Sequence, residues 1–295
     1  MGNVIRVLLV GIFVSALSLE SGTLAQSTAP GGWLTADWAK PPLTAATRKP
    51  APRRSLTGLW GPFGRFGLGT QAGGVLSKPN NGRPENQLPY TPFGLALYKS
   101  HKALEGFDAV LPAEGNDPRN LCEPLGMPRT NHYNVGLTQF YQDDYKISIL
   151  YQYDNRWRTI WTDGRELPKV VDGGVELGGE LREQRFLGYS VGRWIDDYTL
   201  EARTVGTMPE DRVWLDSTGR PISDQVRVLE TFKRISLEEM EWSETIDDPK
   251  VYSKPWETMK LPMRLHDPRT DIMEYYCSPV EQANYNKVFG STVSK

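Results

Sequence analysis

The stretch 145-YKISILYQYDNRWRTIWTDG-164 decides the fold class of this chain of 295 residues. From Tyr145 to Tyr153, large apolar side chains occupy every second position, which is the period of a half-buried β-strand. Asp154-Asn155 has the composition of a turn, and residues 157–162 form the expected return strand. Asp163-Gly164 is a further hairpin signal. The stretch therefore predicts two paired strands, followed by a second turn at Asp163-Gly164.

The same pattern continues toward the carboxyl terminus. Short alternating segments separated by turn residues lie at 186–194, 198–205, 226–232, 240–246, 259–265 and 272–277. About eight or nine short strands, without long helices between them, are typical of an all-β domain. We therefore expect a mainly β fold, an antiparallel β-barrel or sandwich, rather than a doubly wound α/β sheet.

One short helix is expected before the strands. Thr91 is a good N-cap, Pro92 suits the first helical position, and Gly106 is a natural stop. Phe93 and Leu97 recur at helical spacing, which favours a helix that packs on the core. A helix lying on a membrane surface is the alternative.

The amino terminus has the pattern of a secretory signal peptide. Arg6 precedes an apolar run at residues 7–19, and Thr23-Leu24-Ala25 is a small-x-small cleavage site. The run is short for a bilayer-spanning helix, so an uncleaved anchor is the lesser alternative. We expect a periplasmic or secreted protein with no membrane insertion after the signal is cleaved.

These features divide the chain into four parts. Residues 1–25 are the expected signal peptide, and residues 26–90 are rich in proline and glycine and are expected to form an irregular arm. Residues 91–285 are the expected barrel domain, and residues 286–295 are a carboxyl-terminal tail.

The composition limits the function classes. The formal net charge of -2 argues against a nucleic-acid partner, which would require a basic face. Aromatic residues make up 11% of the chain, a content that favours half-buried strands and flat, apolar ligand sites. The two cysteines, Cys122 and Cys277, suggest one disulfide in an exported protein, with two separate buried thiols as the alternative.

One motif suggests an enzyme. Residues 188–192, GYSVG, match the G-x-S-x-G elbow around a nucleophilic serine, here Ser190. Asp247, Asp248 and His266 follow in the chain order of a Ser-Asp-His triad. An elbow needs a strand, a sharp turn and a helix, whereas the residues after Gly192 continue as strand. A structural strand is thus the favoured interpretation, and a serine hydrolase is the rival.

Other chemistry has weaker signals. Neither His101, His132 nor His266 has metal-ligand spacing to another histidine, so no metal and no cofactor are expected. The Asp-Asp pairs at 143–144, 196–197 and 247–248 lie where turns are expected, and turn chemistry explains them better than acid–base catalysis does.

Arginine and tryptophan residues of the strands are the candidate ligand-binding groups. Arg158, Arg165 and Arg193 flank aromatic positions, and an arginine that points into a barrel could bind a carboxylate. Cross-strand ion pairs are the alternative role for them. Four tryptophans could line a cavity or fill the core: Trp157, Trp161, Trp194 and Trp242.

Three blocks carry a resemblance to a known family. Residues 153–165 (YDNRWRTIWTDGR), 188–194 (GYSVGRW) and 245–256 (TIDDPKVYSKPW) resemble the R-x-I-x-x-D-G-R, G-H-S-V-G-R-W-E-G-D-T-L and T-I-D-D-P-x-x-Y-x-x-P-W signatures of a large family of exported bacterial proteins, mostly uncharacterised. Cys122, in CEPLGMPR, and Cys277 also fit the family. The resemblance spans about residues 90–280 and implies export and, by analogy, a lipocalin-like barrel. The family's histidine is replaced here by Tyr189, a candidate acid or hydrogen-bond donor.

The sequence thus predicts an exported β-barrel that binds an apolar or aromatic small molecule, with a possible lyase, hydratase or isomerase step that needs no cofactor. The candidate catalytic residues are Tyr189, Arg193, Asp163 and Ser190. The candidate ligand-binding residues are Arg158, Trp161, Trp194, Trp242 and Tyr252. The rivals are a serine hydrolase that uses Ser190 and a non-catalytic interaction module.

Overall fold

The computed structural model describes residues 44, 47–62, 75, 77–132, 136–171, 174–177 and 180–290. All of them belong to one compact unit, residues 31–295. The expected signal peptide at 1–25 and much of the expected arm lie outside the described residues. No helix within the described ranges has the length and apolar character needed to cross a bilayer.

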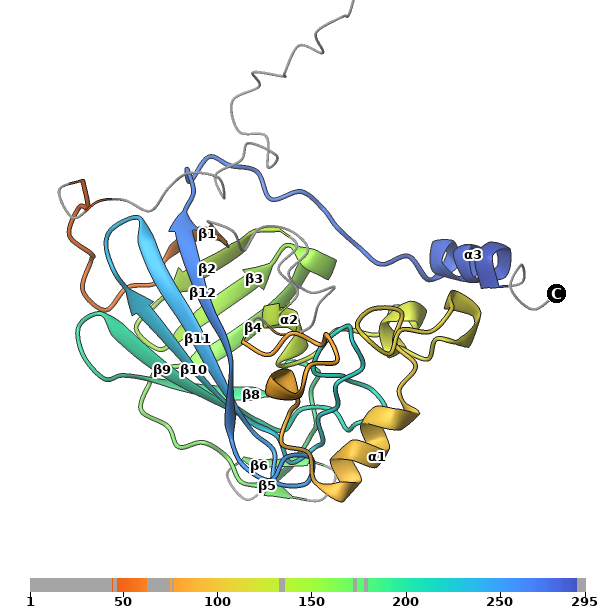
Figure 1. The fold of residues 1–295 in the computed structure, drawn as a ribbon. Helices are drawn as coiled ribbons and strands as arrows, with labels where there is room; N and C mark the ends of the chain where they lie inside the picture. The colour runs from red at the N-terminus through yellow and green to blue at the C-terminus, as the bar shows by residue number, and fades with distance from the viewer. Residues whose placement is uncertain are drawn as a thin grey trace, which may run out of the picture. The chain divides into compact units, whose positions relative to one another are not determined.

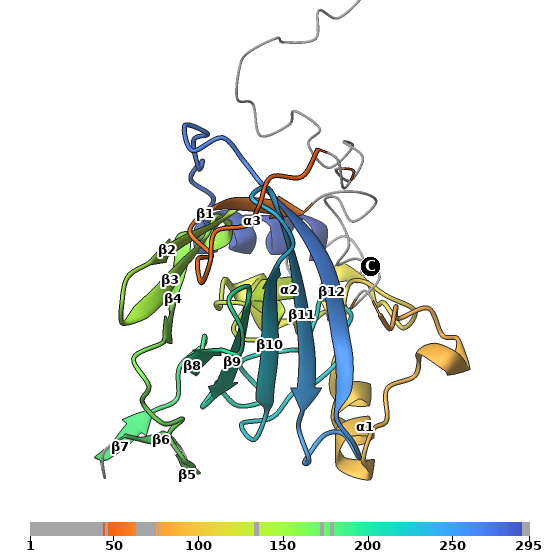
Figure 2. The same ribbon diagram turned by 90° about the vertical axis from the view of Figure 1, so that its left-hand side faces the viewer.

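The expected mainly β fold is confirmed as a closed barrel of nine strands (Figures 1 and 2). Around the barrel the order is β1-β12-β11-β10-β9-β8-β4-β3-β2, and neighbouring strands are antiparallel except for β4 and β8. The strands are β1 (Gly58–Pro62), β2 (Thr138–Gln142), β3 (Lys146–Tyr151), β4 (Arg156–Trp161), β8 (Tyr189–Trp194), β9 (Thr199–Val205), β10 (Arg227–Arg234), β11 (Glu239–Asp247) and β12 (Trp256–Leu265).

The parallel pair β4–β8 is the exception that matters most. Between these strands the chain forms a separate three-stranded sheet of β5 (Val170–Val171), β6 (Gly174–Leu177) and β7 (Glu180–Glu183), so it returns to the barrel in the same direction. Only two Cα pairs join β4 to β8, Ile160 with Ser190 and Trp161 with Val191. The first half of β4 therefore pairs with β3 and not with β8. We call this weakly paired junction the seam.

The decisive hairpin forms where the sequence predicts it. β3 and β4 are paired from Lys146 opposite Trp161 to Tyr151 opposite Arg156. Asp154 and Asn155 both adopt positive φ in the connection. This part of the chain is the short 3-10 helix η5 (Tyr153–Asn155). Asparagine and aspartate tolerate this left-handed conformation better than other non-glycine residues.

The predicted helix is present but shorter than expected. In α1 (Pro92–Ser100) the Thr91 side chain accepts a hydrogen bond from the Gly94 N–H, as an N-cap should. The helix ends at Ser100 and not at Gly106, because His101 is already extended. Gly94 packs against the Val251 carbonyl, and Phe93 is 42% exposed, which differs from the expected core contact.

Several elements differ from the sequence-based expectations. β1 lies inside the segment expected to be an irregular arm and closes the barrel between β2 and β12. The expected strand at 272–277 is irregular, and α3 (Pro279–Gly290) follows it. The other short helices are η2 (Pro84–Asn86), η3 (Pro112–Glu114), η4 (Pro118–Leu121) and α2 (Arg129–His132).

The predicted disulfide is confirmed. Cys122, at the end of η4, is bonded to Cys277, which directly precedes α3, and their Cα atoms are 5.4 Å apart. The bond connects the loop that leads to α2 with the carboxyl-terminal part of the chain.

The barrel interior contains a packed aromatic core. Phe140, Phe232 and Trp242 are buried and in mutual contact, with ring centroids 4.9 to 6.3 Å apart. A second core forms where β10, β11 and their connections meet, and Tyr252 and Trp256 belong to it. Side chains thus fill both ends of the inward-facing surface of these strands, and the residues between the two cores are polar.

Candidate functional site: a pocket at the seam of the barrel

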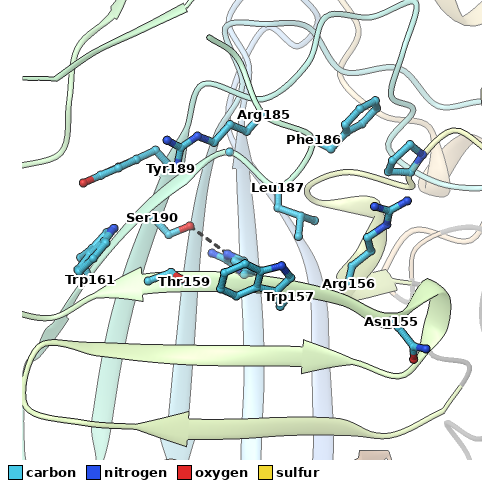
Figure 3. Close-up of a pocket in the computed structure, with 13 residues that line it drawn as sticks. Asn155, Arg156, Trp157, Thr159, Trp161, Arg185, Phe186, Leu187, Tyr189 and Ser190 are labelled. Atoms are coloured by element: carbon cyan, nitrogen blue, oxygen red, sulfur yellow. Dashed lines mark hydrogen bonds between the residues drawn. The ribbon is translucent and has the colours of Figure 1, made fainter. Parts of the chain in front are cut away.

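A pocket of about 430 Å³ opens at the seam (Figure 3). One wall comes from the first half of β4, and the other comes from the segment that leads into β8. The lining residues are Pro124, Asn155, Arg156, Trp157, Arg158, Thr159, Trp161, Arg185, Phe186, Leu187, Gly188, Tyr189 and Ser190.

The pocket lies where the segment before β8 forms a turn and does not pair with β4. The Gly188 N–H donates to the Arg185 carbonyl (3.0 Å), which closes a turn, and Gly188 has a φ of +63°. A Cβ at Gly188 would lie 2.7 Å from Thr204 Cγ2 and 2.8 Å from the Val205 carbonyl. Glycine is therefore required both for the backbone conformation and for the close approach to β9.

Strand alternation decides which side chains of β4 reach the pocket. Trp157, Thr159 and Trp161 point to the outer face, whereas Arg158 and Ile160 point into the barrel. Trp157 is 72% exposed, although it is a large apolar side chain. The pocket thus has an aromatic outer wall on β4, with Phe186 and Leu187 on the opposite side (Figure 3).

The floor of the pocket is a buried polar pair, Arg158 and Ser190. Arg158 Nε donates to Ser190 Oγ (2.9 Å), and Nη2 donates to Thr204 Oγ1 (2.7 Å). Both terminal nitrogens also donate to the carboxylate of Glu230, in a bidentate ion pair. Burial alone would lower the pKa of the guanidinium, but the Glu230 carboxylate outweighs burial and raises it. Arg158 is therefore a permanent cation with a fixed partner.

This pair is part of a larger buried network. Glu230 and Glu244 are directly opposite each other on β10 and β11, where two like charges would repel. The Asn131 amide donates to both carboxylates, at 2.8 and 2.9 Å. His132 Nε2 lies 3.0 Å from Glu244 Oε2, and Thr258 Oγ1 donates to the same oxygen (2.8 Å).

The network accounts for the pKa shifts of Glu244 and Tyr151. Burial opposes ionisation of Glu244, but the charge of His132 and the hydrogen bonds from His132, Asn131 and Thr258 hold its pKa below the ordinary value. Burial raises the pKa of Tyr151 to about 12, and its hydroxyl donates to Asn131 Oδ1 (2.9 Å). Each of the two buried carboxylates therefore has its own basic partner, Arg158 for Glu230 and His132 for Glu244.

Helix α2 supplies Asn131 and His132 to the inward-facing carboxylates of β10 and β11. Arg129 fixes this helix through a bidentate ion pair with Asp117, with nitrogen–oxygen distances of 2.8 and 2.6 Å. Burial opposes ionisation of Asp117, but Arg129 keeps its pKa low. Asp117 is the N-cap of η4, and η4 leads into the disulfide at Cys122. The loop after α1 thus places the polar side chains of α2 in the network.

A second polar cluster lies at one end of the pocket, beside Trp161 and Tyr189. The Arg165 guanidinium is 3.7 Å from the centroid of the Trp161 ring and donates to the Tyr189 hydroxyl (2.8 Å). Asp163 pairs with Arg165 at 2.6 Å, and the hydrogen bonds from Arg165 lower the pKa of this carboxyl. The cluster orients Trp161 and Tyr189 at one end of the pocket.

The structure brings some predicted residues together and separates others. Arg158, Trp161, Tyr189 and Ser190 line the seam pocket, and Asp163 lies beside it. Trp242 belongs to the aromatic core inside the barrel, and the partly buried Trp194 packs against this core. Tyr252 is in the second core, where its hydroxyl donates to the Pro221 carbonyl (2.6 Å). Arg193 is exposed on the outer face, opposite Glu201 of β9.

The geometry around Ser190 differs from a nucleophile elbow. Ser190 lies within β8, which continues to Trp194 and pairs with β9, so no helix follows the serine. Its hydroxyl bonds with Arg158 and Thr204, and neither side chain can act as a general base. The expected acids have other partners: Asp248 accepts from Ser223, and Asp247 pairs with Arg227.

The turn interpretation of two other Asp-Asp pairs is confirmed. Asp143 accepts from the Tyr145 and Lys146 N–H groups, and Asp196 accepts from the Tyr198 N–H. Within the described ranges, no three His, Cys, Asp or Glu side chains are arranged to hold a metal ion.

Sequence reasoning missed Arg185, Phe186 and Leu187. The expected strand at 186–194 begins three residues before β8, so it includes Phe186 and Leu187 and leaves Arg185 in the connection. It also missed the buried acids, although a signal was present. Glu230 and Glu244 occupy the inward phase of strands whose other inward residues are apolar. An acid in such a position needs a buried partner.

Comparison of the chain with family models, curated proteins and solved structures found no match. The fold and the seam pocket are therefore the basis for assigning a function.

Proposed function

We propose that this protein binds an apolar or aromatic small molecule in the seam pocket. The observation that carries the proposal is the pocket itself: about 430 Å³ of space with Trp157, Trp161 and Phe186 on its walls and the Arg158–Ser190 pair at its base. A concave site with mainly apolar walls and a few fixed polar groups is typical of small-molecule sites.

The packing inside the barrel supports a site at the wall. Phe140, Phe232 and Trp242 fill the region where a central ligand would lie. Trp157, in contrast, is 72% exposed, so most of its apolar surface faces solvent. A planar ligand that covers Trp157 would remove apolar surface from water, which is the main source of binding free energy for such ligands.

The lining favours binding over acid–base catalysis. Its residues include no carboxylate and no imidazole. Arg158 is held by Glu230, and Ser190 is held by Arg158 and Thr204. The Tyr189 hydroxyl accepts from Arg165 and retains its own proton, so Tyr189 can orient a ligand by donating a hydrogen bond.

Export to the periplasm or beyond is part of the proposal. Two observations support it: the signal-peptide pattern of residues 1–25 and the Cys122–Cys277 disulfide. Disulfides of this kind persist in oxidising compartments.

The test is a fluorescence titration with the neutral aromatic dye N-phenyl-1-naphthylamine. We expect saturable binding that Trp157→Ala weakens by about tenfold, the effect of losing an aromatic anchor. Tyr141→Ala is the matched control, because Tyr141 is an exposed aromatic residue of β2 outside the pocket. Equal binding by the Trp157→Ala variant and the wild type, or no saturable binding by either, would rule out the seam pocket as the site.

A further inference from the structure

The charges of the seam pocket define the ligand class more narrowly. Three arginines line the pocket, Arg156, Arg158 and Arg185, and no acidic residue does. An uncompensated cation beside an apolar cavity favours a ligand that brings its own negative charge. The question is which of the three guanidinium groups is free to bind that charge.

Arg158 is fully committed to the protein. Four of its five N–H groups are used in the bonds to Ser190, Thr204 and the two oxygens of Glu230. The charge of Arg158 is balanced by Glu230, and a ligand anion would have to displace a buried carboxylate to reach it.

Arg156 also has an acidic partner. Its Nε donates to Asp154 Oδ2 (2.8 Å) in the turn between β3 and β4. Asp154 lies in that turn and Arg156 is the first residue of β4, so the pair is local in sequence and leaves little uncompensated charge at this end of the pocket.

Arg185 is different from both. Within the described residues, no carboxylate forms an ion pair with it; its guanidinium carbon is 5.7 Å from the centroid of the Tyr189 ring. Its backbone is fixed, because its N–H donates to the Gly206 carbonyl (3.0 Å) and its carbonyl accepts from Gly188. A rigid backbone with a free guanidinium is a suitable anchor for an anion.

We propose that Arg185 makes the seam pocket selective for aromatic molecules that carry an anionic group, such as an aromatic carboxylate or sulfonate. This inference rests on the proposed function and specifies its ligand. The aromatic part lies against Trp157 and Trp161, and the anionic group meets Arg185 on the opposite wall, beside Tyr189 (Figure 3).

The experiment compares two dyes that differ in one group. N-phenyl-1-naphthylamine is neutral, and 8-anilino-1-naphthalenesulfonate has the same ring system with a sulfonate. Each is titrated into the wild type, Arg185→Gln, Arg185→Lys and Arg193→Gln at low and high salt. Arg193→Gln is the matched control, because Arg193 is an exposed arginine of β8 outside the pocket.

We expect Arg185→Gln to weaken binding of the sulfonate by about five- to tenfold and to leave the neutral dye unchanged. Arg185→Lys retains most of the sulfonate affinity, and Arg193→Gln retains all of it. Added salt weakens the sulfonate in the wild type and has little effect in Arg185→Gln.

The outcomes separate the two proposals. If Arg185→Gln binds the sulfonate as tightly as the wild type does, while the neutral dye still depends on Trp157, then Arg185 does not select the ligand and the binding function remains. If neither dye shows binding that depends on Trp157, both proposals are wrong.

Discussion

The inward-facing residues of β10 and β11 form two regions of opposite chemistry. Phe232 and Trp242 face each other in one layer, and Glu230 and Glu244 face each other in the next. The first region is stabilised by apolar contact alone. The second consists of charges that are buried only because Arg158 and α2 supply partners.

The difference shows how this barrel combines a rigid interior with a pocket in its wall. Apolar residues can pack without outside help, whereas the polar layer needs an arginine from β4 and an amide and an imidazole from α2. Arg158 belongs both to this layer and to the pocket floor. The polar layer thus fixes the floor of the pocket, and the adjacent aromatic layer fills the barrel interior.

The largest effect is expected from breaking the buried ion pair. Glu230→Leu leaves Arg158 charged and without a counter-charge, and should lower the free energy of unfolding by about 3–5 kcal/mol. The measurement is urea denaturation at neutral pH. The double variant Arg158→Met/Glu230→Leu should recover most of the loss, because no buried charge is then left alone.

A surface pair provides the control for that prediction. Asp247→Asn removes the partner of Arg227, 3.5 Å away, where both side chains are well exposed. We expect a change of at most about 1 kcal/mol. If the double variant in the interior loses as much stability as the sum of its single variants, the ion-pair account of the polar layer is wrong.

An intermediate effect with a defined pH dependence is expected at Glu244. Its pKa is lower in the folded protein than the ordinary value of 4.5, so its ionised form stabilises the fold. This contribution is fully present at neutral pH and is lost as the pH falls through the ordinary glutamate range to the lower folded pKa. Glu244→Gln should lower stability by about 1.5–3 kcal/mol at neutral pH.

The difference between wild type and Glu244→Gln should therefore shrink as the solution is acidified. Denaturation curves at a series of pH values measure it. Glu241→Gln, an exposed glutamate of the same strand, is the control and should show no such trend. A difference that stays constant down to low pH would contradict the assignment of Glu244 as a buried, ionised carboxylate.

Among the substitutions in the barrel interior, the smallest effect is expected in the apolar region. Ile149→Val removes one methylene group from a fully buried side chain of β3 and should cost about 0.5–1.5 kcal/mol, without pH dependence. Chemical denaturation at two pH values checks both points. A loss as large as that of Glu230→Leu would mean that the two regions do not differ in the way described.

Local patterns account for much of the fold. The β3–β4 hairpin, the cap at Thr91 and the disulfide depend on neighbouring residues or on residue type, and the sequence predicts them. β1 is five residues long, with glycine and proline at its ends, and becomes a strand only through its distant partners β2 and β12. The parallel pairing of β4 with β8 could not be predicted from the sequence either, because it depends on where the chain returns to the barrel after β5–β7.

The candidate site follows the same rule. Arg158 and Trp161 could be selected from the sequence, because both are large side chains with binding chemistry within one predicted strand of alternating pattern. The sequence could not show that Arg158 points inward to Glu230 while Trp161 points outward. The partners on α2 could not be inferred, because a helix of four residues has no periodic pattern.

The most direct test of the account is a crystal structure of the protein with N-phenyl-1-naphthylamine bound. The account predicts the naphthyl ring at the seam, in contact with Trp157 and Leu187 and above the Arg158–Ser190 pair, with Phe232 and Trp242 still in contact inside the barrel. A dye bound between Phe232 and Trp242, or at any site that does not include Trp157, would contradict it.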